Sequence, residues 1–306
     1  TSTGNWTIED YAGSNDGTSV NMTSANLVQS DLSFTNGYSP YALDFDGIND
    51  YIDLGTSLSL PDEYTISCWI NINNTAQGAR AIIYKGSNTS YEFGLEVNRT
   101  SGKLSTLGAS NGPVFTSNTT LAAGVWYHAA LTKTISGGTI TYTFFLNGIS
   151  DGSGLTSTTP NYTSGITAIG RYGSSSVGYF NGEISNLALW NTALTSSQVT
   201  EIYNESVPSN LNNHSAYSNL VNWWQLGSNS GFNAATSQWT VLDEKGTSNG
   251  VSSANMANDD IVNGVGYTGN GLGATTIDIV GDAPYSEANS TSVNIAASDR
   301  VNDVPS

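Results

Sequence analysis

Short runs of alternating apolar and polar residues, separated by turn residues, fill most of the chain between residues 41 and 190. In the first run, Leu43 and Phe45 fall on one face of an extended segment and Asp44 falls on the other. The runs that we expect to be strands are 41–46, 51–54, 64–72, 81–85, 91–97, 125–132, 139–146, 166–170 and 182–190. Many short alternating strands predict an all-β, antiparallel two-sheet jelly-roll sandwich.

One short helix is predicted after the last of these strands. Thr195 can cap its amino end, and Gln198 stands three residues later, where a capping box places its second member. Val199, Ile202 and Tyr203 then recur with the spacing of one helix face.

The charge of the chain excludes several classes of function. Eight Lys and Arg residues stand against 25 Asp and Glu residues, which gives a net charge of −17. Such a charge repels phosphate backbones and anionic lipid surfaces, so we expect no nucleic-acid partner and no membrane partner. No apolar run reaches the roughly 18 residues that a spanning helix needs, and the single cysteine, Cys68, excludes an intramolecular disulfide.

The chain is predicted to contain two domains, a jelly roll at 1–207 and a smaller β-rich unit at 208–306, joined by the polar linker 208–215. The smaller unit partly repeats the amino-terminal segment at one constant offset. The residues that coincide include Trp6, Asp10, Gly13 and Gly17, matched by Trp239, Asp243, Gly246 and Gly250. The second copy either packs on the first domain as a partial module or donates strands to a neighbouring chain. Because the sequence starts at Thr1 and not at Met, we expect that its amino terminus was processed.

Several motifs, in this order and spacing, carry a resemblance to a known superfamily. They are Leu43–Tyr51, Tyr64–Trp69, Trp126–His128, Leu146–Gly148 and Tyr179–Ile184 with the continuation to Tyr203. With these motifs the stretch from Trp6 to Tyr203 resembles the laminin-G-like, concanavalin A-like jelly rolls, which include pentraxins and many lectins. The wider sequence, including Trp223–Gly227, the segment that starts at Trp239 and Asp282–Tyr285, also resembles jelly-roll structural proteins of marine bacteriophage particles. The resemblance implies the sandwich fold and a tendency toward surface recognition, and it fixes no ligand.

Catalysis is not expected. Glucanases of this superfamily carry a Glu-x-Asp-x-x-Glu strand, because retaining hydrolysis needs two carboxyl groups about 5 Å apart. The nearest match starts at Glu183, where Ser185 and Ala188 replace the other two acids. His128 lies in a predicted strand and His214 in the predicted flexible linker, so neither is placed as the base of a serine nucleophile.

No cofactor is required by this interpretation, and the metal that the sequence suggests is a structural calcium ion. Its candidate ligands are Asp46, Asn49 and Asp50 in a predicted hairpin turn, with Asp10 or Asp16 near the amino end as further candidates. The alternative is that these side chains only build turns by bonding their own backbone. The loop at 171–177, where pentraxin-like sites draw ligands, has no carboxylate.

Glycan binding would need aromatic platforms beside polar side chains, since sugars combine apolar faces with hydroxyl groups. Tyr84 and Tyr91 flank one loop, and Tyr172 and Tyr179 flank another. We take these four tyrosines as candidate ligand-binding residues. Against this, single surface tyrosines are common in proteins and need no function.

Together these observations predict a non-enzymatic structural and recognition protein. We expect it on a virion surface or outside the cell, as a capsid decoration, fibre or tail component of a phage particle. Its expected partners are other virion or surface proteins, copies of itself in a homo-oligomer or multi-copy assembly, and cell-surface glycans. The alternative is a secreted bacterial lectin or adhesin module.

Overall fold

The structure is a computed structural model, and it describes residues 7–8, 17–18, 39–73, 80–87, 91–107, 114–157, 165–173 and 176–265. The chain divides into two compact units. One unit is Tyr38–Val265, and the other combines Thr1–Gly37 with Gly266–Ser306. In the second unit, β1 (Thr7–Ile8) pairs antiparallel with β2 (Gly17–Thr18).

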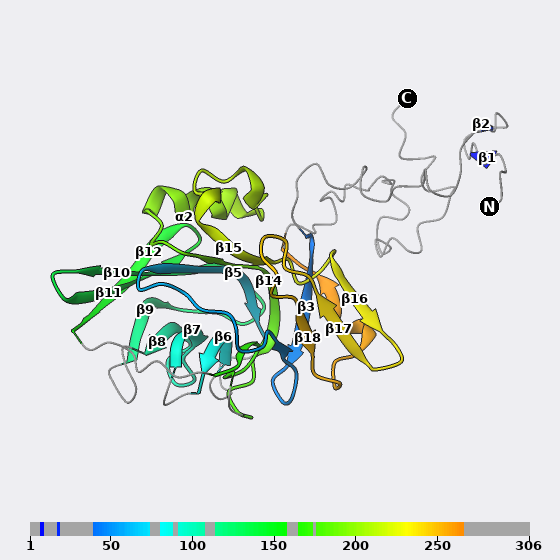
Figure 1. The fold of residues 1–306 in the computed structure, drawn as a ribbon, viewed down its shortest axis with the longest axis horizontal. Helices are drawn as coiled ribbons and strands as arrows, with labels where there is room; N and C mark the ends of the chain where they lie inside the picture. Colours follow the sequence, from blue (N-terminus) through cyan, green and yellow to red (C-terminus); the bar gives the residue numbers. More distant parts are fainter. Residues whose placement is uncertain are drawn as a thin grey trace. The chain divides into compact units, whose positions relative to one another are not determined.

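The unit Tyr38–Val265 contains two antiparallel sheets, of which the first has eight strands (Figure 1). The strands run in the order β12-β11-β10-β5-β14-β3-β19, and β15 also pairs with β14. They are β3 (Tyr41–Asp46), β5 (Tyr64–Ile72), β10 (Trp126–Ser136), β11 (Thr139–Leu146), β12 (Ile149–Thr156), β14 (Asn181–Trp190), β15 (Leu220–Trp224) and β19 (Ile261–Asn263).

The second sheet has nine strands in the order β16-β17-β18-β4-β13-β6-β7-β8-β9. They are β4 (Ile52–Asp53), β6 (Arg80–Gly86), β7 (Tyr91–Val97), β8 (Lys103–Leu107), β9 (Val114–Thr120), β13 (Thr167–Ile169), β16 (Ser230–Asn233), β17 (Gln238–Val241) and β18 (Gly250–Ser252).

The core lies between the two sheets and is built from the alternating apolar residues. Ile66 and Ile70 of β5 belong to the same buried cluster as Phe93 and Leu95 of β7. Burial of such side chains away from water is the main force that holds two sheets together. The predicted two-sheet sandwich is therefore confirmed. Cys68 is buried in the same cluster, and burial raises the pKa of its thiol, so the thiol stays protonated and unreactive.

Strand β14 changes partners halfway along its length. Its first half pairs with β3 and its second half with β15, so β3 and β15 lie end to end along one side of it. The change occurs at Asn186, which has a positive φ of 48° and interrupts the register with β5 between Ser185 and Ala188. The Asn186 side chain donates to the carbonyl of Ser39, which fixes this irregularity.

The predicted helix is confirmed as α2 (Ser196–Tyr203), with Thr195 as its amino-terminal cap. The Thr195 hydroxyl accepts from the Gln198 backbone at 3.3 Å, and the Gln198 side chain accepts from the Thr195 backbone at 2.9 Å, so both bonds of the capping box are present. No helix in the described part of the chain is long and apolar enough to cross a membrane.

The helix and the segment after it cover half of the outward face of the eight-stranded sheet (Figure 1). Three short 3₁₀ turns follow α2, at Asn204–Ser206, Leu211–Asn213 and Tyr217–Asn219. Leu211, Val199 and Ile202 pack with Trp190 and Trp223 in a second buried cluster on this side of the sheet. This cover ties the helix to the sandwich.

The predicted boundary between residues 207 and 208 does not separate two compact units. Strand β15 completes the eight-stranded sheet beside β14, β18 pairs with β4, and β19 pairs with β3. Residues 208–265 therefore belong to the sandwich and extend both of its sheets. The sequence pattern correctly predicted β-strands after residue 207. It could not show that these strands pair with β14, β4 and β3 of the sandwich.

Candidate functional site

Three of the four tyrosines predicted as sugar platforms form a buried cluster. Tyr84, Tyr91 and Tyr172 expose only 0%, 1% and 6% of their surface. The Tyr84 ring lies 4.8 Å from the Tyr172 ring and 5.5 Å from the Tyr91 ring, and its edge fills the space that a side chain at Gly94 would need. The prediction of a sugar site assumed that these tyrosines are exposed, and the structure shows that they are buried. The fourth tyrosine, Tyr179, is partly buried and lies outside this cluster.

A buried carboxylate organises the tyrosine cluster. Glu96 accepts a hydrogen bond from the Tyr172 hydroxyl at 2.7 Å and another from the Ser105 hydroxyl at 2.8 Å. Burial raises the pKa of Glu96, and the two hydroxyl donors partly offset that rise. Burial also raises the pKa of Tyr84, whose hydroxyl has no hydrogen-bond partner in the described structure. These contacts are those of a packed polar core.

The predicted calcium turn is closed by its own hydrogen bonds. Asp46 Oδ1 accepts from the backbone N–H groups of Ile48, Asn49 and Asp50 at 2.7, 3.0 and 3.3 Å. Asp50 Oδ2 accepts in return from the Asp46 N–H at 3.0 Å. Burial raises the pKa of Asp50 to about 6, and the charges of Asp46, Asp260 and Asp44 act in the same direction. These bonds are the ones expected from the alternative interpretation, in which the side chains build the turn by bonding its own backbone.

Within the described ranges, no three His, Cys, Asp or Glu side chains converge so as to hold a metal ion. Calcium at Asp46, Asn49 and Asp50 stays a prediction. Asp10 and Asp16 lie outside the described residues.

The other half of the outward face of the eight-stranded sheet carries a row of polar and aromatic residues, which we call the outward lane. It consists of Asp44 on β3, Glu183 on β14, Asn71 on β5 and Trp126 on β10. Glu183 pairs with Asp44 on one side and with Asn71 on the other, and Asn71 pairs in turn with Trp126. Because the flanking residues of these strands pack in the core, the four side chains point away from it.

The outward lane is rich in hydrogen-bond acceptors. The pKa of Glu183 is raised to about 7, mainly by burial and next by the charge of the facing Asp44, while the bond from Asn71 acts in the lowering direction. Burial raises the pKa of Asp44 as well. Glu183 Oε2 and Asn71 Oδ1 are themselves buried and have no hydrogen-bond partner among the described residues, so a ligand would reach them only after a small movement of these side chains. Donor groups of a ligand, such as hydroxyls, would complement this row.

Of the four residues of the lane, only Glu183 could be singled out from the sequence as a candidate acid. Asp44 is recognisable there only as a strand residue, and no binding role was predicted for Trp126. The signal that joins them is strand register, because pairing across β3, β14, β5 and β10 brings together residues that are far apart in the chain. The two remaining positions of the glucanase-like strand are structural, since Ser185 donates to the carbonyl of Tyr41 and Ala188 is buried.

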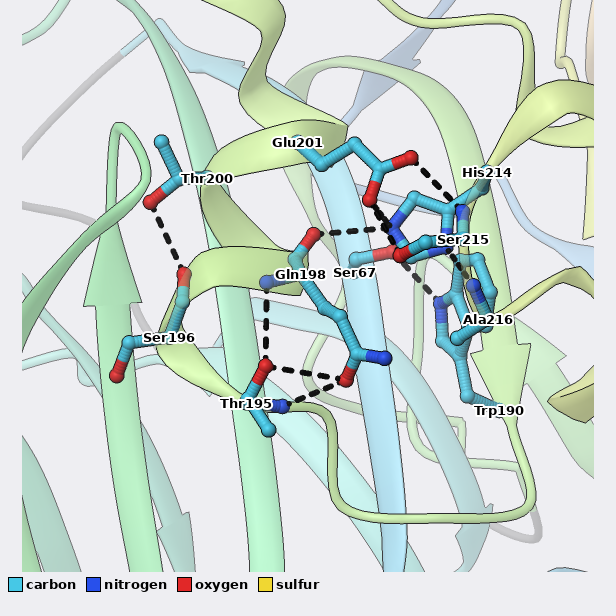
Figure 2. Close-up of polar contacts among 10 residues, drawn as sticks. All are labelled: Ser67, Trp190, Thr195, Ser196, Gln198, Thr200, Glu201, His214, Ser215 and Ala216. Carbon is cyan, nitrogen blue, oxygen red and sulfur yellow. Dashed lines mark hydrogen bonds and ion pairs between the residues drawn. The ribbon is translucent and has the colours of Figure 1, made fainter.

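His214 is buried in an ordered contact, which corrects its placement in a flexible linker (Figure 2). Its Nδ1 accepts from the Ala216 N–H at 3.0 Å, so Nε2 carries the proton and donates to the Gln198 carbonyl of α2 at 2.9 Å. The ring packs on Trp190 with centroids 4.7 Å apart. His214 thus fastens the segment after α2 to the helix.

The neighbouring Ser215 and Glu201 do not complete a nucleophilic triad with His214. The Ser215 hydroxyl donates to Glu201 Oε2 at 2.5 Å, and its backbone N–H donates to Glu201 Oε1 at 2.8 Å (Figure 2). The hydroxyl is therefore paired with the carboxylate, whereas a serine nucleophile needs the histidine as its base.

His128 is fully buried on the outward face, where its ring packs against Trp69 and Tyr203, which also stack on each other. Burial lowers its pKa to about 3, and neither ring nitrogen has a hydrogen-bond partner in the described part of the molecule. It is a neutral packed side chain.

Comparison with known proteins assigns this architecture to a family. Residues 46–200 match the family model of the concanavalin A-like lectin/glucanases superfamily, a laminin-G-type model, and the chain belongs to this superfamily. No curated protein matches the chain.

Solved structures share the fold at low sequence identity. A protein of Bacteroides ovatus, provisionally described as a carbohydrate binding protein, is 19% identical with a TM-score of 0.52, and the match covers 70% of this chain and 58% of that one. This chain thus spans little more than half the length of that protein. A heptameric SAP-like pentraxin of Limulus polyphemus (19%, TM-score 0.41) matches over 54% of this chain and 82% of its own. The CBM40 module of a Ruminococcus gnavus sialidase (13%, TM-score 0.43) matches over 54% and 99%.

Proposed function

We propose that this chain is a non-enzymatic recognition protein that binds uncharged glycans through the outward lane. The observation that carries the proposal is the row of carboxyl and amide acceptors that ends at the Trp126 indole. Sugar hydroxyls donate hydrogen bonds to such acceptors, and an aromatic ring packs against the apolar face of a pyranose. Membership of a superfamily of lectins and glucanases supports the proposal, as does the description of the Bacteroides ovatus protein.

The charge of the lane and of the whole chain selects among glycans. Asp44 and Glu183 face each other, and the net charge is −17. Sialylated and uronic-acid glycans carry carboxylates that this surface repels. Neutral hexose glycans are therefore the expected ligands.

The site of action that we propose is the surface of a phage particle, with the chain as a capsid decoration, fibre or tail component present in many copies. A net charge of −17 makes copies of the chain repel one another, which keeps such a densely displayed protein soluble. Mass spectrometry of purified particles tests this assignment, and a chain missing from every particle would contradict it. A secreted bacterial lectin or adhesin is the alternative, which a secretion signal in the complete gene product would favour.

A glycan array probed with the full chain tests the ligand. We expect binding to neutral glycans and weaker binding to their sialylated counterparts. Trp126→Ala is expected to weaken binding at least about tenfold, or ~1.4 kcal/mol, whereas Tyr179→Ala leaves it within about twofold. The opposite result would place the glycan at the predicted tyrosine loop, and no binding to any glycan would contradict the proposed function.

One observation favours a hydrolase as the second candidate. Glu183 and Asp44 are carboxyl groups on directly paired strand positions, and the pKa of Glu183 is raised to about 7, as in a general acid. Turnover of a polysaccharide by the full chain, abolished by Glu183→Gln, would establish hydrolysis and refute the non-enzymatic assignment.

A further inference from the structure

The hairpin of β1 and β2 has the same register as the hairpin of β17 and β18. The sequence repeat aligns the two segments at one constant offset, and at that offset every described pair of the first hairpin falls on a pair of the second. The matched pairs are Thr7–Thr18 with Thr240–Val251, and Ile8–Gly17 with Val241–Gly250. The two segments are therefore copies of one structural element.

In the second copy, the residues that the copies share contact the sandwich. Trp239 is buried in the core, and its indole N–H donates to the Ala257 carbonyl at 2.8 Å. Gly250 pairs within the hairpin, yet a Cβ at this position would meet Ile52 Cγ2 of β4 at 2.3 Å and Leu54 Cδ2 at 2.8 Å. The glycine is thus needed for the close approach of β18 to β4 and not for the hairpin itself.

Asp243 and Gly246 make a second contact with the sandwich. Asp243 Oδ1 accepts from the Trp223 N–H at 2.9 Å, and Oδ2 accepts from the Asn222 side chain at 2.6 Å, both in β15. A Cβ at Gly246 would meet the same Asn222 side chain at 2.7 Å. Asp243 also accepts from the backbone of its own loop, so it couples the loop to the strand that receives it.

The first copy keeps the residues with these docking roles. Trp6, Asp10 and Gly13 lie outside the described residues and correspond in sequence to Trp239, Asp243 and Gly246, while Gly17 corresponds to Gly250. Trp239 and Gly250 serve contacts outside the hairpin, and Asp243 and Gly246 serve contacts both within its loop and outside it, so an isolated hairpin would not require the four together. Within this sandwich, the position that fits them is filled by β17 and β18.

We propose that the β1–β2 hairpin is a docking element for another sandwich of this same fold, one whose own closing hairpin is absent. Its strand β2 would pair with the edge that corresponds to β4, and its Trp6 would enter the core as Trp239 does here. Its Asp10 would accept from the strand that corresponds to β15. Neighbouring sandwiches would thereby be joined by strand addition, which combines backbone hydrogen bonds with burial of an aromatic anchor.

A chimaera of the full chain tests whether the two copies are interchangeable. Residues 239–251 are replaced by the sequence of residues 6–18, which has the same length and register. We expect a folded protein with a single thermal transition within a few degrees of the wild type. The matched control carries Gly250→Val in the same chimaera, and we expect its transition to fall sharply because the valine meets Ile52. A chimaera that fails to fold, or one that tolerates the valine, would overturn the proposal.

A double-mutant cycle in the full chain tests docking itself. Trp239→Ala weakens the resident hairpin and opens its position to the hairpin of a second copy. We expect Trp6→Ala to leave the thermal transition of the wild type unchanged but to lower that of the Trp239→Ala variant. We also expect the Trp239→Ala variant to double in mass by light scattering, and Trp6→Ala to abolish this association. Purely additive effects, or association that does not depend on Trp6, would refute docking by the first hairpin.

Discussion

The two halves of the outward face of the eight-stranded sheet are built on the same strands and have opposite characters. Under α2 and the segment that follows it, β14 and β15 contribute Trp190 and Trp223 to a buried cluster. At the other end of β14 the outward residue is Glu183, flanked by Asp44 and Asn71. The inward residues of β5, from Tyr64 to Ile72, are apolar along the whole strand, so strand alternation fixes the core, while the cover decides whether the outward face packs or binds.

The two halves also respond to pH in opposite directions. Burial under Tyr203 lowers the pKa of His128 to about 3, and partial burial beside Asp44 raises the pKa of Glu183 to about 7. Burial favours the neutral form of each group, so the histidine weakens the fold as pH falls and the glutamate weakens it as pH rises.

The largest expected difference between the halves comes from removing a tryptophan. Trp190 is fully buried and donates to the Ser67 hydroxyl at 3.2 Å, so Trp190→Ala is expected to lower the free energy of unfolding by about 3–5 kcal/mol. Trp126→Ala, in the partly exposed lane, is expected to lower it by less than about 1.5 kcal/mol. Chemical denaturation monitored by circular dichroism measures both. Equal losses would show that the lane is packed as tightly as the covered half.

A smaller effect is expected at His128. His128→Phe keeps a ring packed against Trp69 and Tyr203 and removes two buried nitrogens that lack partners, so it is expected to stabilise the fold by about 1–3 kcal/mol at pH 7. The histidine contribution is fully present above pH 6.5, the ordinary pKa of the unfolded chain, and is lost as pH falls toward 3. The gain of the variant should therefore grow by about 1.4 kcal/mol per pH unit in this window. A gain that stays constant between pH 7 and pH 5 would contradict the neutral, buried state of His128.

The covered half shows how far sequence alone reaches. The alternation of β5 and β14 and the capping box of α2 are local patterns, and both were predicted correctly. The order of His214 was not, because an Asn-rich segment that looks like a linker becomes ordered only through contacts with Gln198 and Trp190, which lie elsewhere in the chain.

The candidate sites show the same limit. A tyrosine that flanks a glycine- and serine-rich loop is expected to be exposed. Tyr84 and Tyr172 are buried instead, because their rings pack on each other and the Tyr172 hydroxyl donates to Glu96 of β7. Glu183 could be recognised as a strand-face residue, yet its pairing with Asp44 and Asn71 depends on strand register, which the sequence does not reveal.

The smallest effect is expected from Glu183→Gln, which tests the charge of the outward lane without changing its packing. Glu183→Gln keeps the size of the side chain and removes its ionisation. Since the pKa of Glu183 is raised to about 7 in the fold, its contribution to stability is fully present below pH 4.5 and is lost as pH rises through 7. The variant should thus match the wild type at pH 4.5 and exceed it at pH 8. We expect a difference of less than about 1 kcal/mol, because the carboxyl group is partly screened by solvent.

The control is Asp259→Asn, which removes the same charge from an exposed position. If Asp259→Asn gives the same gain at pH 8, the effect belongs to the excess negative charge of the whole chain and not to the lane. A gain confined to Glu183→Gln would instead mean that partial burial of the Glu183 carboxyl group and the charge of the facing Asp44 together penalise its ionised form. Sheet register imposes this crowding, since pairing across β3 and β14 sets Asp44 opposite Glu183 whether or not a ligand is bound.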